Sequence, residues 1–260
     1  MVTNPEVVVV LPALNEGETV GRQVQAILAH PNLRAVGARR IVVVDNGSDD
    51  DTSTVALTAG AEVVREPRRG YGAACLAGAV AAVGADVLLL MDADGSDDLA
   101  GAAQVARLVV SGEADLAMGS RVCGHAERGA LTPVQRAGNL VATRLMRPIY
   151  GLRISDLGPT RAMRRDTLLA LDMQEMTYGW STEMLAKAAR AGLRITEIPV
   201  DYHARAAGRS KVSGTLTGSL RAGYRILATA CRYARWRPDA LLRPSSGAAC
   251  PDAGVSEGVA

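Results

Sequence analysis

The strongest constraint on the fold comes from two short runs made only of apolar residues. They cover residues 7–10 and 87–90, and neither run alternates polar with apolar side chains. A strand with this composition is buried on both faces, as in a parallel sheet that helices cover on each side. The sequence therefore predicts an α/β fold with a mostly parallel sheet flanked by helices.

Strand and helix patterns alternate with short connections, as βα units require. In the first part of the chain the predicted strands are residues 6–11, 39–45, 61–65 and 86–91, and the predicted helices are residues 17–29, 51–59 and 70–82. After residue 99 the pattern is looser. There it predicts helices at residues 100–110, 132–150, 181–191 and 215–235, and strands at residues 114–118, 160–163 and 194–202.

The chain divides into three stretches. A length of 260 residues is enough to bury a core that needs no disulfide bonds. We expect one folded domain over residues 1–214 and a basic amphipathic helix over residues 215–237. Residues 238–260 are rich in Pro, Ser, Gly and Ala, and we expect them to form a disordered tail.

Charge and cysteine content exclude several classes of protein. The 29 basic and 27 acidic side chains leave a net charge of +2, so general nucleic-acid binding is excluded. The four cysteines lie far apart without a C-x-x-C pair, which favours a reducing compartment over a zinc knuckle or a disulfide framework. The N-terminus lacks a basic signal segment, and Asp86 interrupts the most apolar stretch, residues 73–91. We therefore expect a cytoplasmic protein without a transmembrane anchor.

Polar and acidic side chains follow three of the predicted strands. Asn15 and Glu16 follow the first, Asp45 ends the second, and Asp92 and Asp94 follow the fourth. Ligands of open α/β sheets bind beyond the carboxyl ends of the strands. Asp92 and Asp94 are two residues apart, so both carboxylates face one side of an extended chain. Paired oxygen ligands of this kind suit Mg²⁺ or Mn²⁺ carrying a diphosphate.

Each of these groups also has a purely structural interpretation. Asn15 could cap the next helix, and the segment after Asp45 could be a turn. A single D-x-D in a loop is often only solvated. Their joint position at three strand ends favours a ligand site. Two other nucleotide-binding motifs are missing, because no G-x-G-x-x-G follows the first strand and the chain contains no P-loop.

Five segments resemble family 2 glycosyltransferases of the GT-A fold. They read LPALNE (residues 11–16), VVDNGS (43–48), RGYGA (69–73), MDADGS (91–96) and GSR (119–121). Four more resemble, within that family, the polyprenyl (dolichyl) phosphate sugar synthases: GPTR (158–161), EML (183–185), EIPVDY (197–202) and GRSK (208–211). The resemblance spans residues 7–214 and implies a GT-A fold with a Rossmann-like sheet.

The resemblance also implies a role for each matching side chain. The nucleoside would be held by Pro12, Asn15, Glu16 and Asp45, and the metal and diphosphate by Asp92 and Asp94. The acceptor phosphate or the donor diphosphate would be surrounded by Arg121, Arg136, Arg205 and Lys211. The loop that holds Arg205 and Lys211 is polar, and we expect it to close over bound substrate.

The implied activity is inverting transfer of a hexose from a nucleotide-diphosphate sugar to a polyprenyl phosphate. A phosphate acceptor is already ionised and needs cations instead of a general base. One alternative is a soluble hydroxyl acceptor, which would need a carboxylate base, with Glu183 and Asp156 as the candidates. Glu183 could instead form an ion pair with Lys187, four residues on. A second alternative is a sugar-nucleotide-binding protein without catalysis.

The predicted helix at residues 215–235 offers a way to reach a lipid acceptor. At about 100° per residue, one face carries Leu216, Leu220, Gly223, Tyr224, Leu227, Cys231 and Ala234, and Arg221, Arg225, Arg232 and Arg235 flank it. Such a helix can lie in an anionic interface, which would place the protein peripherally on the inner face of a membrane. The alternative is that this apolar face packs on the core of the domain itself.

Overall fold

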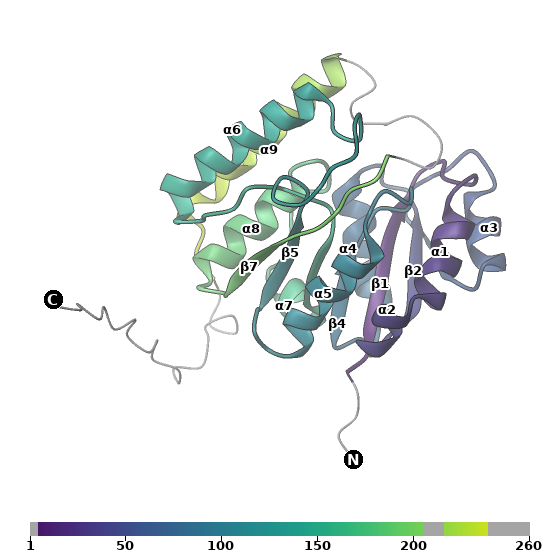
Figure 1. Ribbon diagram of the computed structural model, residues 1–260. Helices are drawn as coiled ribbons and strands as arrows, with labels where there is room; N and C mark the ends of the chain where they lie inside the picture. The colour runs from purple at the N-terminus through teal and green to yellow at the C-terminus, as the bar shows by residue number, and fades with distance from the viewer. Residues whose placement is uncertain (1–4, 205–215, 239–260) are drawn as a thin grey trace, which may run out of the picture.

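The computed structural model describes residues 5–204 and 216–238, with the backbone alone at residues 216–222. It contains a seven-stranded sheet in the order β3-β2-β1-β4-β6-β5-β7, with helices on both faces (Figure 1). The strands are β1 (Val7–Ala13), β2 (Ala38–Asp45), β3 (Glu62–Arg65), β4 (Val87–Leu90), β5 (Leu116–Ser120), β6 (Arg161–Arg164) and β7 (Ile195–Pro199). Among these strands, β6 alone runs antiparallel to its neighbours, which are β4 and β5. The predicted α/β fold with a mostly parallel sheet is confirmed.

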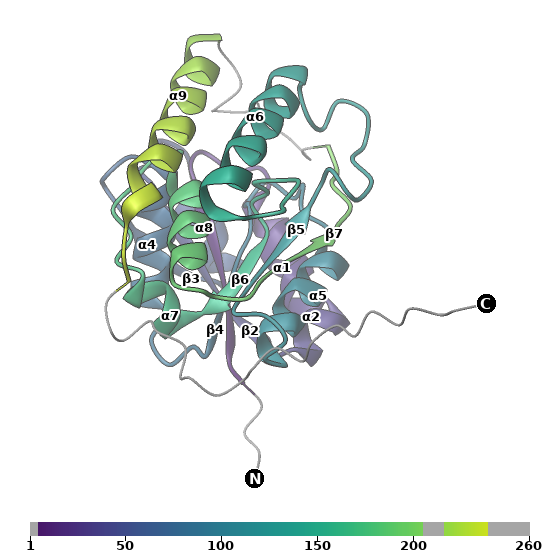
Figure 2. The ribbon, with the colours of Figure 1, turned by 90° about the vertical axis from the view of Figure 1, so that its left-hand side faces the viewer.

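The helices form two layers that enclose the sheet. They are α1 (Val20–Ala29), α2 (Pro31–Ala35), α3 (Thr52–Thr58), α4 (Tyr71–Ala81), α5 (Leu99–Val110), α6 (Pro133–Tyr150), α7 (Arg165–Ala170), α8 (Trp180–Arg190) and α9 (Leu216–Arg232), followed by the 3-10 turn η1 (Tyr233–Arg235). Helices α1, α2, α3 and α5 pack against one face, and α4, α7 and α8 pack against the other (Figure 2). The central strands β1 and β4 are therefore buried on both sides, whereas the edge strands β3 and β7 are partly exposed.

The position of β1 between two cores explains why residues 7–10 are all apolar. Val7 and Val9 point into one core, whereas Val8 and Val10 point into the other. All four side chains are fully buried. Each buried valine stabilises the fold by about 1.5–3 kcal/mol, so a polar residue at any of these positions is strongly disfavoured.

The strands and helices predicted from the sequence are present in the described part of the chain, with ends shifted by a few residues. Two short helices were not predicted, α2 with 5 residues and α7 with 6. They are too short to show a helical period in the sequence. The predicted domain boundary at residue 214 and the predicted tail from residue 238 fall largely outside the described residues and stay predictions.

Helices α6 and α9 lie side by side above the carboxyl ends of the strands (Figures 1 and 2). The phenol of Tyr150 at the end of α6 donates a hydrogen bond to the carbonyl of Ala230 in α9. Ala230 and Tyr233 are buried against the body of the domain. Within the described residues, no helix is both long and apolar enough to cross a membrane.

Candidate functional site

A cavity of about 490 Å³ opens beyond the carboxyl ends of β1, β2 and β4. This is the edge of an α/β sheet at which ligands bind. Its wall combines the three strand ends with the start of α4, the segment before β6, and the helices α6, α8 and α9. Its polar and charged lining includes Glu16, Asn46, Arg69, Tyr71, Asp92, Asp94, Arg121, Gln135, Thr177, Tyr178, Ser181 and Tyr202.

The strand-end carboxylates Asp92 and Asp94 both line this cavity. Asp94 is buried, and its Oδ1 accepts hydrogen bonds from the N–H and the hydroxyl of Ser96 at 3.0 and 2.5 Å. Among the described residues, no group of three or more His, Cys, Asp or Glu side chains is placed to hold a metal ion. Two carboxylates in an open cavity fit Mg²⁺ or Mn²⁺ that takes its other ligands from a substrate's phosphates.

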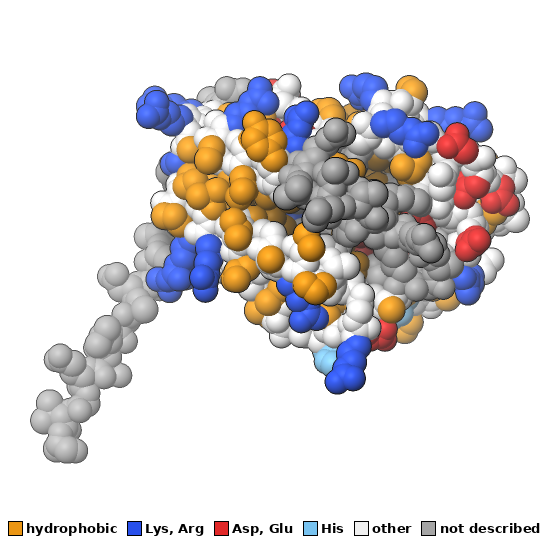
Figure 3. Space-filling model, turned by 90° about the horizontal axis from the view of Figure 1, so that it is seen from above, with side chains coloured by type: hydrophobic (Ala, Val, Ile, Leu, Met, Phe, Trp, Pro, Cys, Tyr) orange, Lys and Arg blue, Asp and Glu red, His pale blue; other side chains and the backbone are white. Residues whose placement is uncertain are grey.

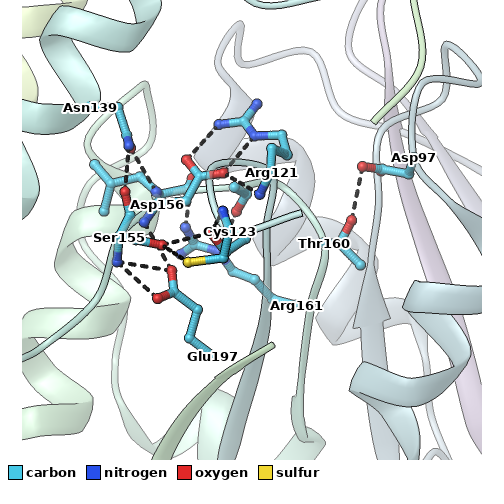
Figure 4. A network of polar contacts seen from close by, with 12 residues as sticks. Asp97, Arg121, Cys123, Asn139, Ser155, Asp156, Thr160, Arg161 and Glu197 are labelled. Atoms are coloured by element: carbon cyan, nitrogen blue, oxygen red, sulfur yellow. Dashed lines mark hydrogen bonds and ion pairs between the residues drawn. The ribbon is translucent and has the colours of Figure 1, made fainter. Parts of the chain in front are cut away.

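Asp97 is a further carboxylate near these two and is buried, and it was not singled out from the sequence. Its Oδ2 accepts the N–H of Asp92 at 2.8 Å. Its Oδ1 accepts the hydroxyl of Thr160 at 2.8 Å, as Figure 4 shows. Burial raises the pKa of Asp97, and these hydrogen bonds offset only part of that rise. Asp97 therefore ties the segment after β4 to the start of β6 and holds Asp92 in position.

The four residues predicted to hold a nucleoside separate into two pairs. Pro12 and Glu16 line the cavity. Asn15 has a φ of 50°, and its Oδ1 accepts the N–H of Asp49 at 2.8 Å. Asp45 turns inward, where its carboxylate accepts hydrogen bonds from Ser48 and Ser53.

Asn15 and Asp45 thus shape the loops behind the cavity. Burial opposes ionisation of Asp45, but the hydrogen bonds from Ser53 and Ser48 outweigh it and lower its pKa. Asn15 does not cap the next helix, because Thr19 occupies that position and α1 has no side-chain cap.

Arg69 is a cation of the cavity that the sequence analysis did not assign. The loop that presents it is held by Asn46, whose Nδ2 donates to the carbonyls of Glu66 and Arg68 at 2.9 and 2.7 Å. The Oδ1 of Asn46 accepts the N–H of Gly70 at 2.7 Å. Gly70 has a φ of 148°, and a Cβ there would lie 2.1 Å from a backbone oxygen. The loop therefore requires glycine after Arg69.

Arg121, which also lines the cavity, forms a bidentate ion pair with Asp156 (Figure 4). The Nε and one terminal nitrogen of Arg121 lie 2.7 and 2.9 Å from the two carboxylate oxygens. Burial opposes ionisation of Asp156, but the Arg121 guanidinium outweighs it and lowers the pKa of that carboxyl. Glu197 accepts the N–H groups of Ser155 and Asp156, so β7 holds the pair from behind.

A second cavity of about 430 Å³ lies on the far side of Arg121. Arg121, Arg136 and His125 are basic or titratable members of its wall, Asn139 and Ser155 are polar members, and no acidic side chain lines it among the residues described. Leu131, Leu140 and Val122 add an apolar part. The structure thus brings Arg121 and Arg136 to one cavity, whereas Arg205 and Lys211 lie outside the described residues.

Arg161 is a buried side chain that sequence reasoning missed. Its guanidinium donates to the carbonyls of Leu157, Gly158 and Ser181 at 2.8 to 3.0 Å. Leu157 and Ser181 line the first cavity. Arg161 therefore fastens the segment before β6 to the start of α8 and keeps this part of the wall in place.

The two candidate bases are both fully buried in ion pairs. Glu183 lies 2.8 Å from the Nζ of Lys187 and accepts the N–H groups of Gln174 and Glu175. Asp156 is the partner of Arg121. Neither carboxylate lines one of the two cavities. The helix-side ion pair expected as the alternative for Glu183 is the arrangement that the structure shows.

The chain segment before residue 205 contacts the walls of both cavities, because Tyr202 lines the first and its N–H donates to the carbonyl of His125, which lines the second. The N–H of His203 donates to the carbonyl of Ser96, and its Nδ1 lies 2.9 Å from a carboxylate oxygen of Glu127. Burial, with a smaller contribution from the charge of Asp92, raises the pKa of Tyr202 to about 12, so its phenol is neutral. The guanidinium of Arg121 lies 5.0 Å from the centre of the Tyr202 ring.

Comparisons with known proteins concern the family and the fold of the chain. The model of the family "Glycosyl transferase family 2" matches residues 8–171. An uncharacterized glycosyltransferase of Mycobacterium tuberculosis is 42% identical over 217 residues, which cover 82% of this chain and 93% of the relative. An undecaprenyl-phosphate mannosyltransferase of Micrococcus luteus is 33% identical over 226 residues, covering 82% and 89%.

Among solved structures, the fold is similar to glucosyl-3-phosphoglycerate synthase of Mycobacterium tuberculosis. That crystal structure contains Mn²⁺, UDP-glucose and phosphoglyceric acid. The two chains superpose with a TM-score of 0.68 at 25% identity, covering 91% of this chain and 81% of the other.

Proposed function

Since the chain belongs to glycosyl transferase family 2, we propose that it transfers a hexose, with inversion, from a nucleotide-diphosphate sugar to a polyprenyl phosphate. The observation that carries the proposal is the pair of cavities that share Arg121. We call the cavity with Asp92 and Asp94 the donor cavity. The cavity with Arg136 is called the acceptor cavity.

The donor cavity suits a nucleotide diphosphate. Among its lining residues, Pro12 and Glu16 would hold the nucleoside, and Asp92 and Asp94 would hold the diphosphate. A divalent cation bound by Asp92 and Asp94 would neutralise the charge that develops on the leaving diphosphate. Arg69 adds a protein cation to the same wall.

The acceptor cavity suits a phosphate on an apolar chain. Its arginines can bind the phosphate, and its leucines can contact the first isoprene units. The phosphate monoester has a second pKa near about 6 and needs no base. One of its oxygens forms the new bond to the anomeric carbon as the bond from that carbon to the diphosphate oxygen breaks. The electron pair of the broken bond leaves with the nucleotide.

The relatives support a phosphate-bearing acceptor. One is named as an undecaprenyl-phosphate mannosyltransferase, and the solved structure was obtained with phosphoglyceric acid. That structure makes a soluble acceptor the second candidate. A hydroxyl acceptor needs a general base, and the candidate bases Glu183 and Asp156 are both buried in ion pairs. This observation favours the polyprenyl phosphate as acceptor. We propose that a cytoplasmic enzyme uses it while bound peripherally at the inner face of a membrane.

A donor screen tests the proposal. Release of nucleoside diphosphate is followed for a panel of UDP- and GDP-sugars, with Mg²⁺ or Mn²⁺, in the presence and absence of a short polyprenyl phosphate in detergent. We expect release with one donor to depend on both the polyprenyl phosphate and the cation. Release that responds to phosphoglycerate or a free sugar, and ignores the polyprenyl phosphate, would support the soluble-acceptor candidate instead.

A further inference from the structure

We propose that the outward faces of α6 and α9 form one docking surface for an anionic lipid bilayer. This two-helix surface stands above the carboxyl ends of the strands (Figure 2). The inference deepens the proposed function, because a polyprenyl acceptor resides in a bilayer. Its own support comes from exposure and charge on the two helices.

Helix α6 has an apolar stripe that faces away from the domain. Val134 and Val141, two turns apart, are 51% and 53% exposed. Pro148 lies two turns after Val141 on the same stripe and is exposed as well. The helix already has a packed face, on which Ala142 and Met146 are buried. A surface helix ordinarily presents polar residues opposite its packed face, so this second apolar face calls for a partner.

The packed face of α9 differs from the apolar face predicted for residues 215–235. Thr229 and Ala230 near its C-terminal end are buried, as is Tyr233 in the 3-10 turn that follows. Tyr224 and Cys231, which belong to the predicted apolar face, point outward, and Tyr224 is 72% exposed. The helix thus packs on the domain by one face and leaves part of another apolar face open.

The charges on the two helices select an anionic partner. Neither α6 nor α9 contains an Asp or Glu residue, and Arg144, Arg147 and Arg232 are exposed. Basic side chains surround the hydrophobic ones on this face, whereas acidic side chains gather at the far end, over α3 (Figure 3). A second copy docked by this surface would bring arginines against arginines, which disfavours self-association. Anionic headgroups with an apolar layer beneath them match both properties.

The docking surface is continuous with both cavities. Arg136 and Leu140 of α6 line the acceptor cavity. Gln135 of α6 and Ile226 of α9 line the donor cavity. An acceptor that keeps its chain in the bilayer could therefore present its phosphate to Arg136 without leaving the membrane.

Vesicle flotation with the full chain tests this surface. The probes are phosphatidylcholine vesicles with and without phosphatidylglycerol, at low and high salt, without any substrate. We expect binding only with phosphatidylglycerol, and weaker binding at high salt. The double variant Val134→Asp/Val141→Asp should weaken binding at least about tenfold, and Arg144→Gln or Arg147→Gln about fivefold each.

Matched controls come from other helices. Val80 on α4 is 55% exposed, so Val80→Asp repeats the substitution at equal exposure. Arg34→Gln on α2 removes an exposed arginine elsewhere. Both should bind vesicles like the wild type, and all variants should keep the wild-type unfolding temperature.

Three results would overturn the docking surface: wild-type protein that ignores anionic vesicles at low salt, equal losses in the control variants, or dimerisation abolished by Val134→Asp/Val141→Asp. Transfer to a short polyprenyl phosphate in detergent is measured on the same variants and should be unchanged. If vesicle binding fails while this transfer persists, only the docking surface is wrong. If transfer fails while vesicle binding persists, the proposed acceptor is wrong.

Discussion

The donor and acceptor cavities share Arg121 but are built in different ways. The donor wall combines parts of α6, α8 and α9 with strand ends and tight loops, which the side chain of Asn46 holds with three hydrogen bonds and that of Asp45 with two. The acceptor wall consists of α6 and the segments after β5 and before β6, which are held together by the pair of Arg121 with Asp156 and by the side chain of Asn139. The sheet edge therefore fixes most of the donor geometry, whereas the acceptor geometry depends on side-chain contacts of Arg121, Asp156 and Asn139 and on a helix whose outer face is exposed.

Removing the acid of that ion pair tests this difference most strongly. Asp156→Asn leaves the Arg121 guanidinium, which is only 16% exposed, without its charged partner, and breaking a buried pair in this way typically costs about 3–5 kcal/mol. Unfolding by denaturant, followed by circular dichroism, measures the loss. The matched control is Asp115→Asn, because Asp115 and its partner Arg194 are 33% and 59% exposed and their pair should contribute at most about 1 kcal/mol. Equal losses in the two variants would contradict the role given to the buried pair.

The pH dependence of stability sharpens the same prediction. The pKa of Asp156 is lower in the folded protein than in the unfolded chain, because Arg121 overcomes the cost of burial. The pair therefore contributes fully above the ordinary carboxyl pKa of about 4, and this contribution is lost as the pH falls through the lower folded value. The gap in unfolding free energy between wild type and Asp156→Asn should narrow as the pH falls below about 4. A gap that stays constant through this range would exclude the ion pair as its source.

On the donor side we expect the largest loss of activity from Asp94→Asn. The change removes one charged oxygen ligand while keeping the shape of the side chain, and we expect kcat to fall by on the order of a hundredfold. Nucleoside diphosphate release with saturating Mn²⁺ measures this loss. Asp166→Asn, at a highly exposed position on α7, is the control and should be neutral. Wild-type turnover by Asp94→Asn, or full activity in excess EDTA, would overturn the metal assignment.

Two single-arginine variants should separate the cavities. Arg69→Gln should raise the KM for the nucleotide sugar about tenfold and leave the KM for polyprenyl phosphate unchanged. Arg136→Gln should do the reverse. Each effect corresponds to the loss of about 1.4 kcal/mol of binding. Steady-state kinetics with each substrate varied in turn provide the test, and two variants that shift both constants alike would show that the cavities do not act separately.

Much of the donor side could be predicted from the sequence. The apolar runs at residues 7–10 and 87–90 predict buried parallel strands, and their carboxyl ends must then meet at one edge. Asp92 and Asp94 consequently come to one cavity with Glu16. Arg69 was not predicted because it precedes Gly70 in a loop that resembles an ordinary turn. The hydrogen bonds from Asn46 that hold this loop are visible only in the structure.

The acceptor side could not be predicted in the same way. Strand β6 inserts between β4 and β5, and this order brings Asp156 to Arg121 and Thr160 to Asp97. The pattern of side chains along a strand does not indicate which other strands will pair with it in the sheet. For the same reason Asp156 was considered as a base, because its partner is 35 positions away in the sequence.

Identification of the product tests the central claim most directly. The enzyme is incubated with a labelled nucleotide sugar, a divalent cation and a polyprenyl phosphate, and the lipid fraction is analysed by mass spectrometry and mild acid hydrolysis. We predict a polyprenyl phosphate that carries one hexose through its anomeric carbon and releases the free sugar in mild acid. A labelled product that stays in the aqueous fraction and resists mild acid, with the polyprenyl phosphate recovered unchanged, would contradict it.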